Sequence, residues 1–199
     1  MKHIIILFLF YLFPVMVNAQ AKIEIGMGIA DNDTPELDAG SRLGLKLGIG
    51  YEYHLSPILG IEPAVVLENK GKRHFRMTYL DIPITVNFHF NMAEVDFGPY
   101  LGYRIDSSER DVRDKVIFDG VPSDHSYRLL STADELFSEF DFGFVARVKR
   151  HCGKHVYIGA EGSYGVLNIG RDFGTKYLLT REKYNGHNYT AGLLLGLTF

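Results

Sequence analysis

The feature that most constrains this chain is a period-two alternation of apolar and polar residues that recurs in eight separate segments. In the clearest segment, Arg42–Tyr53, every second residue from Leu43 to Tyr53 is aliphatic or aromatic, and Gly, Lys and Glu lie between them. Alternate side chains of a β-strand point to opposite faces, so each segment predicts a strand with one apolar face. The predicted strands are Lys22–Ile29, Arg42–Tyr53, Leu59–Glu68, Thr78–Phe90, Glu94–Ile105, Phe140–Lys149, His155–Leu167 and Asn188–Phe199.

The first residues have the organisation of a secretory signal peptide. Lys2 and His3 precede an apolar run, Ile4–Phe13, and small residues follow it up to Ala19. The run is shorter than the about 20 residues of a transmembrane helix. We therefore expect export and cleavage after Ala19, with residues 1–19 removed and residues 20–199 forming one domain.

An exported chain of this kind has one way to cross a membrane. No later stretch is apolar for long enough to form a spanning helix, and only helices and closed barrels satisfy their backbone in lipid. Eight is a common strand number for a small bacterial outer-membrane barrel. The sequence therefore predicts an all-β fold, an eight-stranded antiparallel up-and-down transmembrane β-barrel.

The connections between the predicted strands alternate in length. The short ones are 54–58, 91–93 and 150–154, and the long ones are 30–41, 69–77, 106–139 and 168–187. Outer-membrane barrels have short periplasmic turns and longer external loops. The alternation places both chain ends in the periplasm and every long loop outside. In the longest loop, Thr132 and Glu135 could form a capping box for a short helix, although a plain loop fits equally well.

A soluble ligand carrier of the lipocalin kind is the competing barrel. Periodicity alone does not say which face points inward. The polar face here is rich in Gly and carries charges of both signs, which could pair within a narrow lumen, and the aromatic residues gather at strand ends. Both features favour the membrane barrel.

The polar face supplies the residues that we expect in the lumen, as a paired network that fills the barrel; an ion or proton path is the alternative. This set comprises Lys22, Glu24, Lys46, Glu52, Glu62, Glu68, Asp81, Asp96, Arg104, Arg147, Lys149 and Glu161. The aromatic residues predict two girdles on the lipid face. The girdle residues include Tyr51, Tyr53, Phe88, Phe90, Tyr103, Phe142 and Phe199.

Some features fit an ideal strand poorly. Pro63, Pro83 and Pro99 lie within predicted strands, where each removes a ladder hydrogen bond that a bulge could absorb. The single cysteine, Cys152, excludes an internal disulfide.

The sequence offers little chemistry. His74, His125 and His187 fall in different external loops, and solvated side chains are expected there rather than metal ligands. A lipid-modifying barrel enzyme, an acyltransferase or deacylase, would need a nucleophile and a base at the external rim. Its candidates are Asp124-His125-Ser126 and Asp106-Ser107. A net charge of −3 gives no attraction to nucleic acid, and no phosphate-binding loop is present.

Four short motifs together resemble the PorT-like outer-membrane β-barrel proteins of Gram-negative bacteria. They are Tyr79-Leu80-Asp81-Ile82-Pro83-Ile84, Phe97-Gly98-Pro99-Tyr100-Leu101-Gly102-Tyr103, Phe140-Asp141-Phe142-Gly143 and Tyr164-Gly165-Val166-Leu167-Asn168-Ile169. The last strand, ending at Phe199, resembles the signal read by the outer-membrane insertion machinery. The resemblance implies an outer-membrane location and barrel fold, with a secretion-accessory role as one option.

From these patterns we expect a barrel without enzymatic activity, cofactor or metal. Its external loops would bind a partner or serve the envelope. The loop 106–139 is the predicted partner surface, because function concentrates in loops on rigid scaffolds.

Overall fold

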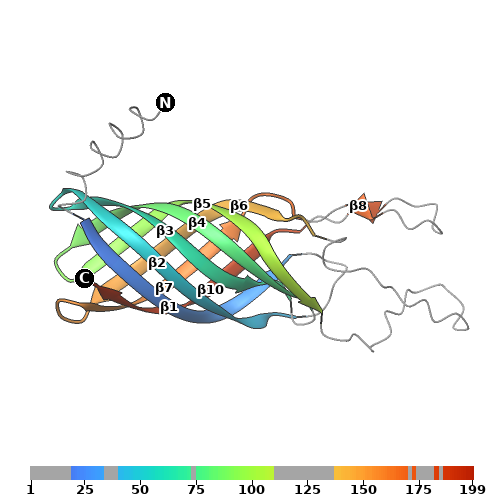
Figure 1. Cartoon of the computed structure of the whole chain (residues 1–199), viewed down its shortest axis with the longest axis horizontal. Helices are drawn as coiled ribbons and strands as arrows, with labels where there is room; N and C mark the ends of the chain where they lie inside the picture. The colour runs from blue at the N-terminus through green and yellow to red at the C-terminus, as the bar shows by residue number, and fades with distance from the viewer. Residues whose placement is uncertain are drawn as a thin grey trace, which may run out of the picture.

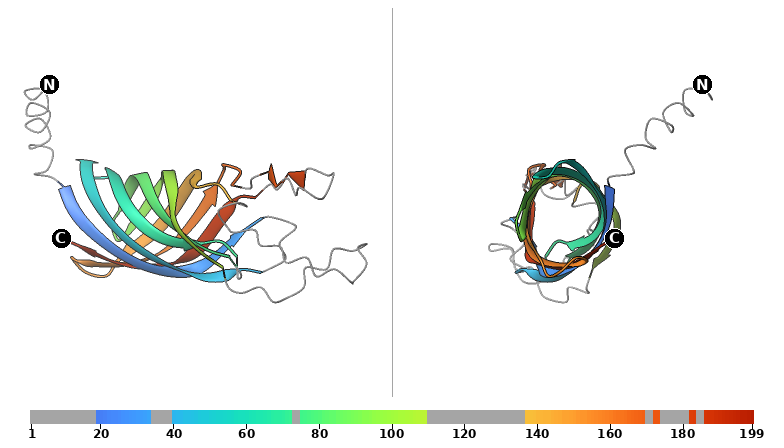
Figure 2. Two further views of the ribbon diagram at one scale, coloured as in Figure 1. Left: turned by 45° about the vertical axis from the view of Figure 1, so that its right-hand side comes forward. Right: turned by 90° about the vertical axis from the view of Figure 1, so that its left-hand side faces the viewer.

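The computed structural model shows a closed antiparallel β-barrel (Figures 1 and 2). It describes residues 19–33, 40–72, 75–109, 137–169, 172–173, 182–183 and 186–199. The barrel strands are β1 (Ala19–Asn32), β2 (Arg42–Ser56), β3 (Leu59–Lys70), β4 (Phe75–Phe90), β5 (Ala93–Glu109), β6 (Phe140–His151), β7 (Val156–Gly165) and β10 (Asn188–Thr198). Two short strands, β8 (Asp172–Phe173) and β9 (Glu182–Lys183), pair only with each other.

Each barrel strand pairs with its neighbours along the chain, and β1 pairs with β10 to close the ring. At the closure, Ile25 lies opposite Leu195, and Glu24 lies opposite Gly196. The end-on view in Figure 2 shows the resulting ring. The predicted fold class, an eight-stranded up-and-down barrel, is confirmed.

The two faces of the barrel differ sharply in polarity. Ile25, Leu45 and Leu193 are 53%, 57% and 68% exposed, and aliphatic or aromatic side chains like these cover the outer face. The charged side chains alternate with them and are buried inside. A soluble lipocalin-like carrier would show the opposite arrangement, so this alternative does not fit the structure.

The two ends of the barrel also differ. Residues 57–58, 91–92 and 152–155 form short turns at the end where Ala19 and Phe199 lie, which we call the turn end (Figure 1). The opposite end, which we call the loop end, carries the other connections. The predicted long connection 69–77 is wrong, because Asn69 pairs with Thr78 and Lys70 with Met77. Only residues 71–74 remain between these strands.

The predicted end of the seventh strand at Leu167 is also wrong. β7 stops at Gly165, and the amides of Val166 and Leu167 both donate to the Phe142 carbonyl, at 2.8 and 3.1 Å. This shared acceptor turns the chain out of the ladder.

The three prolines interrupt ladders without shifting them. On the two sides of Pro63, β2 and β3 keep one register, with Gly50 opposite Ala64 and Tyr53 opposite Ile61. The same is true at Pro83 and Pro99, and the register shifts lie elsewhere, at His54/Ser56 and Thr78/Tyr79. The bulges suggested by the sequence therefore do not occur at the prolines.

Several predictions lie outside the described residues: the signal peptide, most of the loop 106–139 with Thr132 and Glu135, and His74. Among the residues that the structure describes, no helix has the length and apolar character needed to cross a membrane.

Candidate functional site

The lumen holds a continuous set of ion pairs, which we call the central network. Its members are Lys22, Glu24, Lys46, Glu52, Glu62, Glu94, Asp96, Arg147, Lys149 and Glu161. The Lys22 ammonium on β1 lies 2.7 Å from Glu52, 2.9 Å from Glu62 and 2.8 Å from Glu94. Because these partners come from β2, β3 and β5, the contacts cross the barrel interior.

Two basic residues of β6 complete the central network. Lys149 Nζ lies 2.6 Å from Asp96, 3.1 Å from Glu94 and 3.3 Å from Glu62. Arg147 and Lys46 both bond to Glu161. The Tyr157 hydroxyl donates to Glu24 at 2.8 Å. Each basic side chain of the central network therefore lies against at least one carboxylate, as burial of ions requires.

The central network also fills the barrel cross-section. Arg147, Tyr157, Lys22 and Lys149 are among the largest fully buried side chains described, each under 2% exposed. An eight-stranded barrel is only wide enough for its own side chains. A cavity of about 20 Å³, which has room for roughly one water molecule, lies beside Lys46, Glu68 and Glu161.

Towards the loop end lies a second group, the Lys70 cluster, formed by Lys70, Asp81, Tyr100, Asp141 and Asn188. The Lys70 ammonium lies 2.8 Å from Asp81 and 3.2 Å from Asp141. Tyr100 and Asn188 donate to Asp141 at 3.1 and 3.0 Å. The same ammonium lies 4.2 Å from the Tyr100 ring centroid, in a cation–π contact.

An apolar group lies at the loop end of the lumen. Phe137 and Ile169, from the segments that follow β5 and β7, pack with Met77 and Tyr79 of β4, and all four are buried. The Ser138 amide donates to the Ile169 carbonyl at 2.6 Å, which ties the two segments together. We call this group the apolar cap.

The residues predicted for the lumen lie in several places. Glu24, Lys46, Glu52, Glu62, Arg147 and Glu161 belong to the central network, together with Lys22, Asp96 and Lys149. Asp81 lies in the Lys70 cluster, the Arg104 guanidinium lies 3.9 Å from the Met77 sulfur, and Glu68 lines the small cavity. Three further lumen residues, Glu94, Lys70 and Asp141, are not in the set predicted from the sequence. Glu94 and Asp141 alternate with apolar residues in the same way as the predicted lumen residues, whereas Lys70 lies in the predicted connection 69–77.

The predicted girdle residues lie on the outer face. Phe88, Phe90 and Phe199 are exposed near the turn end, where Tyr51 and Tyr53 are half-buried with ring centroids 5.5 Å apart. Tyr103 and Phe142 are exposed nearer the loop end. The rings of Tyr103 and Phe140 pack together with their centroids 5.3 Å apart.

The enzyme candidates form no catalytic group that the structure describes. Asp106 is exposed and Ser107 is half-buried at the end of β5, while Asp124, His125, Ser126 and His74 lie outside the described residues. The ring of His187 stacks on the ring of Tyr164, with the two centroids 5.8 Å apart.

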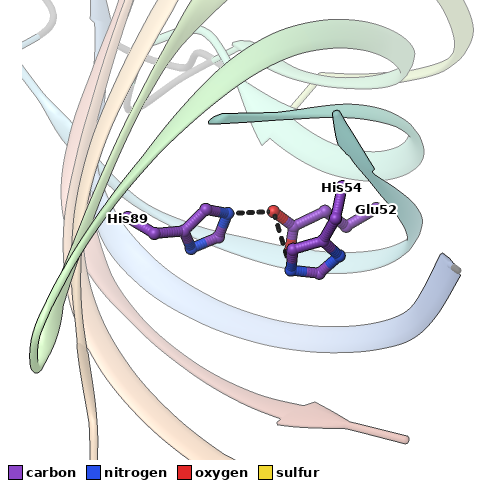
Figure 3. A group of neighbouring side chains, drawn as sticks. All are labelled: Glu52, His54 and His89. Atoms are coloured by element: carbon purple, nitrogen blue, oxygen red, sulfur yellow. Dashed lines mark ion pairs between the residues drawn. The ribbon is translucent and has the colours of Figure 1, made fainter. Parts of the chain in front are cut away.

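Three other histidines lie at the turn end of the lumen, where sequence reasoning assigned them no role. His89 Nε2 is 2.6 Å and His54 Nε2 is 3.9 Å from the same oxygen of Glu52 (Figure 3). His151 Nε2 is 3.0 Å from Glu94. His54 and His89 share the inward parity of Glu52 and Asn87, and this parity is the signal that could have found them.

The chain is similar to known outer-membrane proteins. A family model described as "Outer membrane protein beta-barrel domain" matches residues 5–196. The chain belongs to this family. It is therefore an outer-membrane β-barrel protein, as the sequence predicted, and its exposed apolar face is the lipid-facing surface.

Solved structures of outer-membrane proteins are similar to this chain, and the fold is shared with Neisserial surface protein A. Neisserial surface protein A is 13% identical with a TM-score of 0.50, and the alignment covers 92% of this chain and 97% of that one. OprG from Pseudomonas aeruginosa is 12% identical with a TM-score of 0.49, covering 91% of this chain and 96% of that one. Ail of Yersinia pestis is 14% identical with a TM-score of 0.48, and the alignment covers 92% of this chain and 99% of that one. No curated protein matches the chain.

Proposed function

We propose that this barrel is a sealed, non-enzymatic membrane scaffold that presents its loop-end segments to a partner outside the cell. The observation that carries the proposal is the filled lumen. The apolar cap, the Lys70 cluster and the central network follow one another along the barrel axis, and each is built from buried side chains. A lumen filled in this way supports a scaffold rather than a channel.

The proposed orientation places the turn end in the periplasm. Short turns at one end and longer connections at the other support this orientation. Cleavage after Ala19 would leave Gln20 as the first residue, within β1. The strand that leads to Phe199 would be the segment recognised by the insertion machinery.

The partner surface that we propose is the connection between β5 and β6, within the predicted loop 106–139. Both ends of this connection are held in place, because β5 continues to Glu109 and Phe137 is part of the apolar cap. A loop held on a rigid barrel suits binding. The resemblance to PorT-like proteins suggests that the barrel is an accessory part of a secretion system, with another component of that system as its partner.

The experiment deletes residues 110–136 and joins the strands with a short Gly/Ser linker, which leaves β5 and Phe137 in place. Partners are crosslinked in cells that carry the intact or the deleted chain and are compared by mass spectrometry. We expect the deleted barrel to insert normally and to lose its specific partners. An identical set of partners would contradict the proposed surface.

The sealed lumen is tested separately in planar lipid bilayers. We expect the purified barrel to give no stable conductance steps. The control replaces Lys22, Arg147 and Lys149 with Ala in one chain and is checked for folding, because this change empties the centre of the lumen. Regular conductance steps from the unmodified barrel would contradict the sealed scaffold.

A further inference from the structure

A cluster at the turn end of the lumen has the composition and spacing of a metal site. Glu52 and His54 lie two residues apart on the inward face of β2, and His89 lies on the inward face of β4 (Figure 3). One carboxylate oxygen and two ring nitrogens lie within 4.8 Å of one another. Two imidazoles and a carboxylate are a set that binds Zn²⁺ and related ions. We propose that Glu52, His54 and His89 bind one divalent transition-metal ion of the Zn²⁺ class.

The distances fit such an ion after a small adjustment. Metal bonds of about 2.0–2.2 Å at tetrahedral angles separate two ligand atoms by roughly 3.3 Å. From Glu52 Oε1, the two histidine nitrogens lie at 2.6 and 3.9 Å, on either side of this value. Each nitrogen would move by less than about 1 Å relative to Glu52 Oε1, and the two rings, which stack with planes 21° apart, would rotate so that both nitrogens point at the ion.

Two of the three atoms that would bind the ion lie 2.6 Å from each other and are buried without a hydrogen bond of suitable geometry. Glu52 Oε1 and His89 Nε2 are both inaccessible to solvent, and neither makes a hydrogen bond of suitable geometry to any part of the chain that the structure describes. Buried polar atoms of native proteins almost always have a partner. An ion between these two atoms would satisfy both.

Neighbouring groups hold the ligands in a suitable orientation. Lys22 engages the other oxygen of Glu52, Oε2, at 2.7 Å and leaves Oε1 directed at the histidines. The second nitrogen of His89, Nδ1, faces Glu94 Oε2 at 3.8 Å. A carboxylate behind a metal-binding imidazole is a common supporting contact in metal sites.

The charges around the site favour a cation. The central network contains six carboxylates and four Lys or Arg side chains, so its formal charge is negative when the histidines are neutral. At the turn end, Glu52 and Glu94 share the Lys22 ammonium and also face His54, His89 and His151, so part of this negative surplus borders the site. A divalent ion there would offset the surplus.

Gly60 provides the space in which the three side chains meet. Gly60 of β3 lies between the other two strands, opposite His54 on one side and Asn87 on the other. A Cβ atom added to Gly60 would lie 2.5 Å from Glu52 Oε1. The absence of a side chain on β3 therefore allows Glu52 to reach the two histidines. The site opens at the turn end, because His54 and His89 are 32% and 18% exposed.

The test measures metal binding by the full mature chain, purified without a polyhistidine tag and folded in detergent micelles. Zn²⁺ is titrated by calorimetry, and Co²⁺ is titrated by its visible absorption, which reports ligand geometry. We expect one ion per chain, and we expect H54Q and H89Q each to weaken binding by about 100-fold. The matched control is H155Q, because His155 lies at the same end and bonds to the Thr198 carbonyl outside the cluster. Binding by H155Q should equal that of the unmodified chain.

A further variant, G60A, separates the site from general loss of folding, because it removes no ligand and displaces only the Glu52 carboxylate. We expect G60A to weaken Zn²⁺ binding by about 10-fold or more while the barrel keeps its circular dichroism spectrum. Failure of the unmodified chain to bind one ion would overturn the proposal. Unchanged binding by a folded H54Q/H89Q double variant would also overturn it.

Discussion

At the residue scale, the barrel depends on the balance of single buried charges. Lys149 is fully buried and lies within 3.6 Å of Glu24, Glu62, Glu94 and Asp96. These carboxylates come from different strands, so one ammonium joins several parts of the lumen. Removing one member of a buried ion pair leaves an uncompensated charge, which is more costly than losing an exposed pair.

We predict that K149M lowers the free energy of unfolding by about 3–5 kcal/mol, because four carboxylates would lose a cation partner, which for Asp96 and Glu24 is the nearest one. The measurement is urea unfolding of the barrel in lipid vesicles. The control is R150M on the neighbouring exposed residue of β6, which should change stability by less than about 0.5 kcal/mol. Equal stabilities of the two variants would contradict the role assigned to Lys149.

The contact between Tyr157 and Glu24 gives a second prediction. Y157F removes the hydroxyl that donates to Glu24 and should cost about 1.5–3 kcal/mol, the range for hydrogen bonds to charged groups. G196A should cost at least as much, because a Cβ on Gly196 would lie 2.1 Å from the Tyr157 ring. Thermal unfolding in detergent checks both variants. A G196A barrel as stable as the unmodified one would show that the ring can move freely.

The sequence predicts which residues of this scale face inward but not which of them meet. Parity alone places Glu24, Glu62 and Arg147 on one face. Contacts such as Lys22 with Glu94 join residues 72 positions apart and depend on the barrel radius and stagger, which a one-dimensional pattern does not contain. The cluster of Glu52, His54 and His89 was missed for this reason, since His89 reaches it across β3.

At the element scale, the strands are defined by their lipid-facing side chains. Along β1, Ile23, Ile25, Met27 and Ile29 are all more than 40% exposed, and their partners on β2 and β10 are apolar as well. This continuous apolar surface is expected of a barrel in lipid and would be a liability in water.

We predict that the cost of a charge on this surface depends on depth. I25R, in the middle of β1, should destabilise the barrel by about 2–4 kcal/mol, whereas L55R, near the turn end of β2, should cost about 0–1 kcal/mol. Both residues are exposed, at 53% and 60%, so packing does not explain a difference. Unfolding in vesicles of defined lipid measures both. Similar costs for the two variants would contradict the membrane depth assigned to these positions.

Strand positions were predictable from alternation, but strand ends were not. β3 and β4 extend beyond the predicted limits because Asn69 and Lys70 find partners in Thr78 and Met77, and a polar residue carries no signal of that pairing. The prolines show the converse. Pro63, Pro83 and Pro99 remove donors, yet paired residues on both sides keep the register, so the loss stays local.

At the scale of the whole molecule, closure of β1 on β10 removes every sheet edge from the barrel. We predict that a chain with I25C and L195C, in a C152A background, forms a disulfide within one molecule after mild oxidation. These residues are direct partners, and opposite residues of antiparallel strands lie about 4.5–5.5 Å apart, within disulfide range.

Non-reducing gels and peptide mass spectrometry detect this crosslink. The control pairs I25C with A160C of β7, which is separated from β1 by β10 and should not react within one chain. Efficient crosslinking of the control pair, or none of the direct pair, would contradict the closure register.

The eight barrel strands could be predicted from periodicity, but periodicity is identical for a barrel that is apolar inside and one that is apolar outside. The mixed charges of the polar face favoured the second arrangement, and the structure shows their partners. Lys22 and Lys149 have carboxylates on several sides, which only a narrow closed lumen can supply.

Among the residues that the structure describes, the Lys70 cluster and central network lie on the strands themselves, and Phe137 and Ile169 are the main contribution from outside them. The described contacts inside the barrel are therefore made almost entirely by strand residues. Related proteins are free to exchange, lengthen or shorten those segments over evolutionary time while retaining the same interior. One stable cylinder can in this way display many different surfaces to the surroundings of the cell.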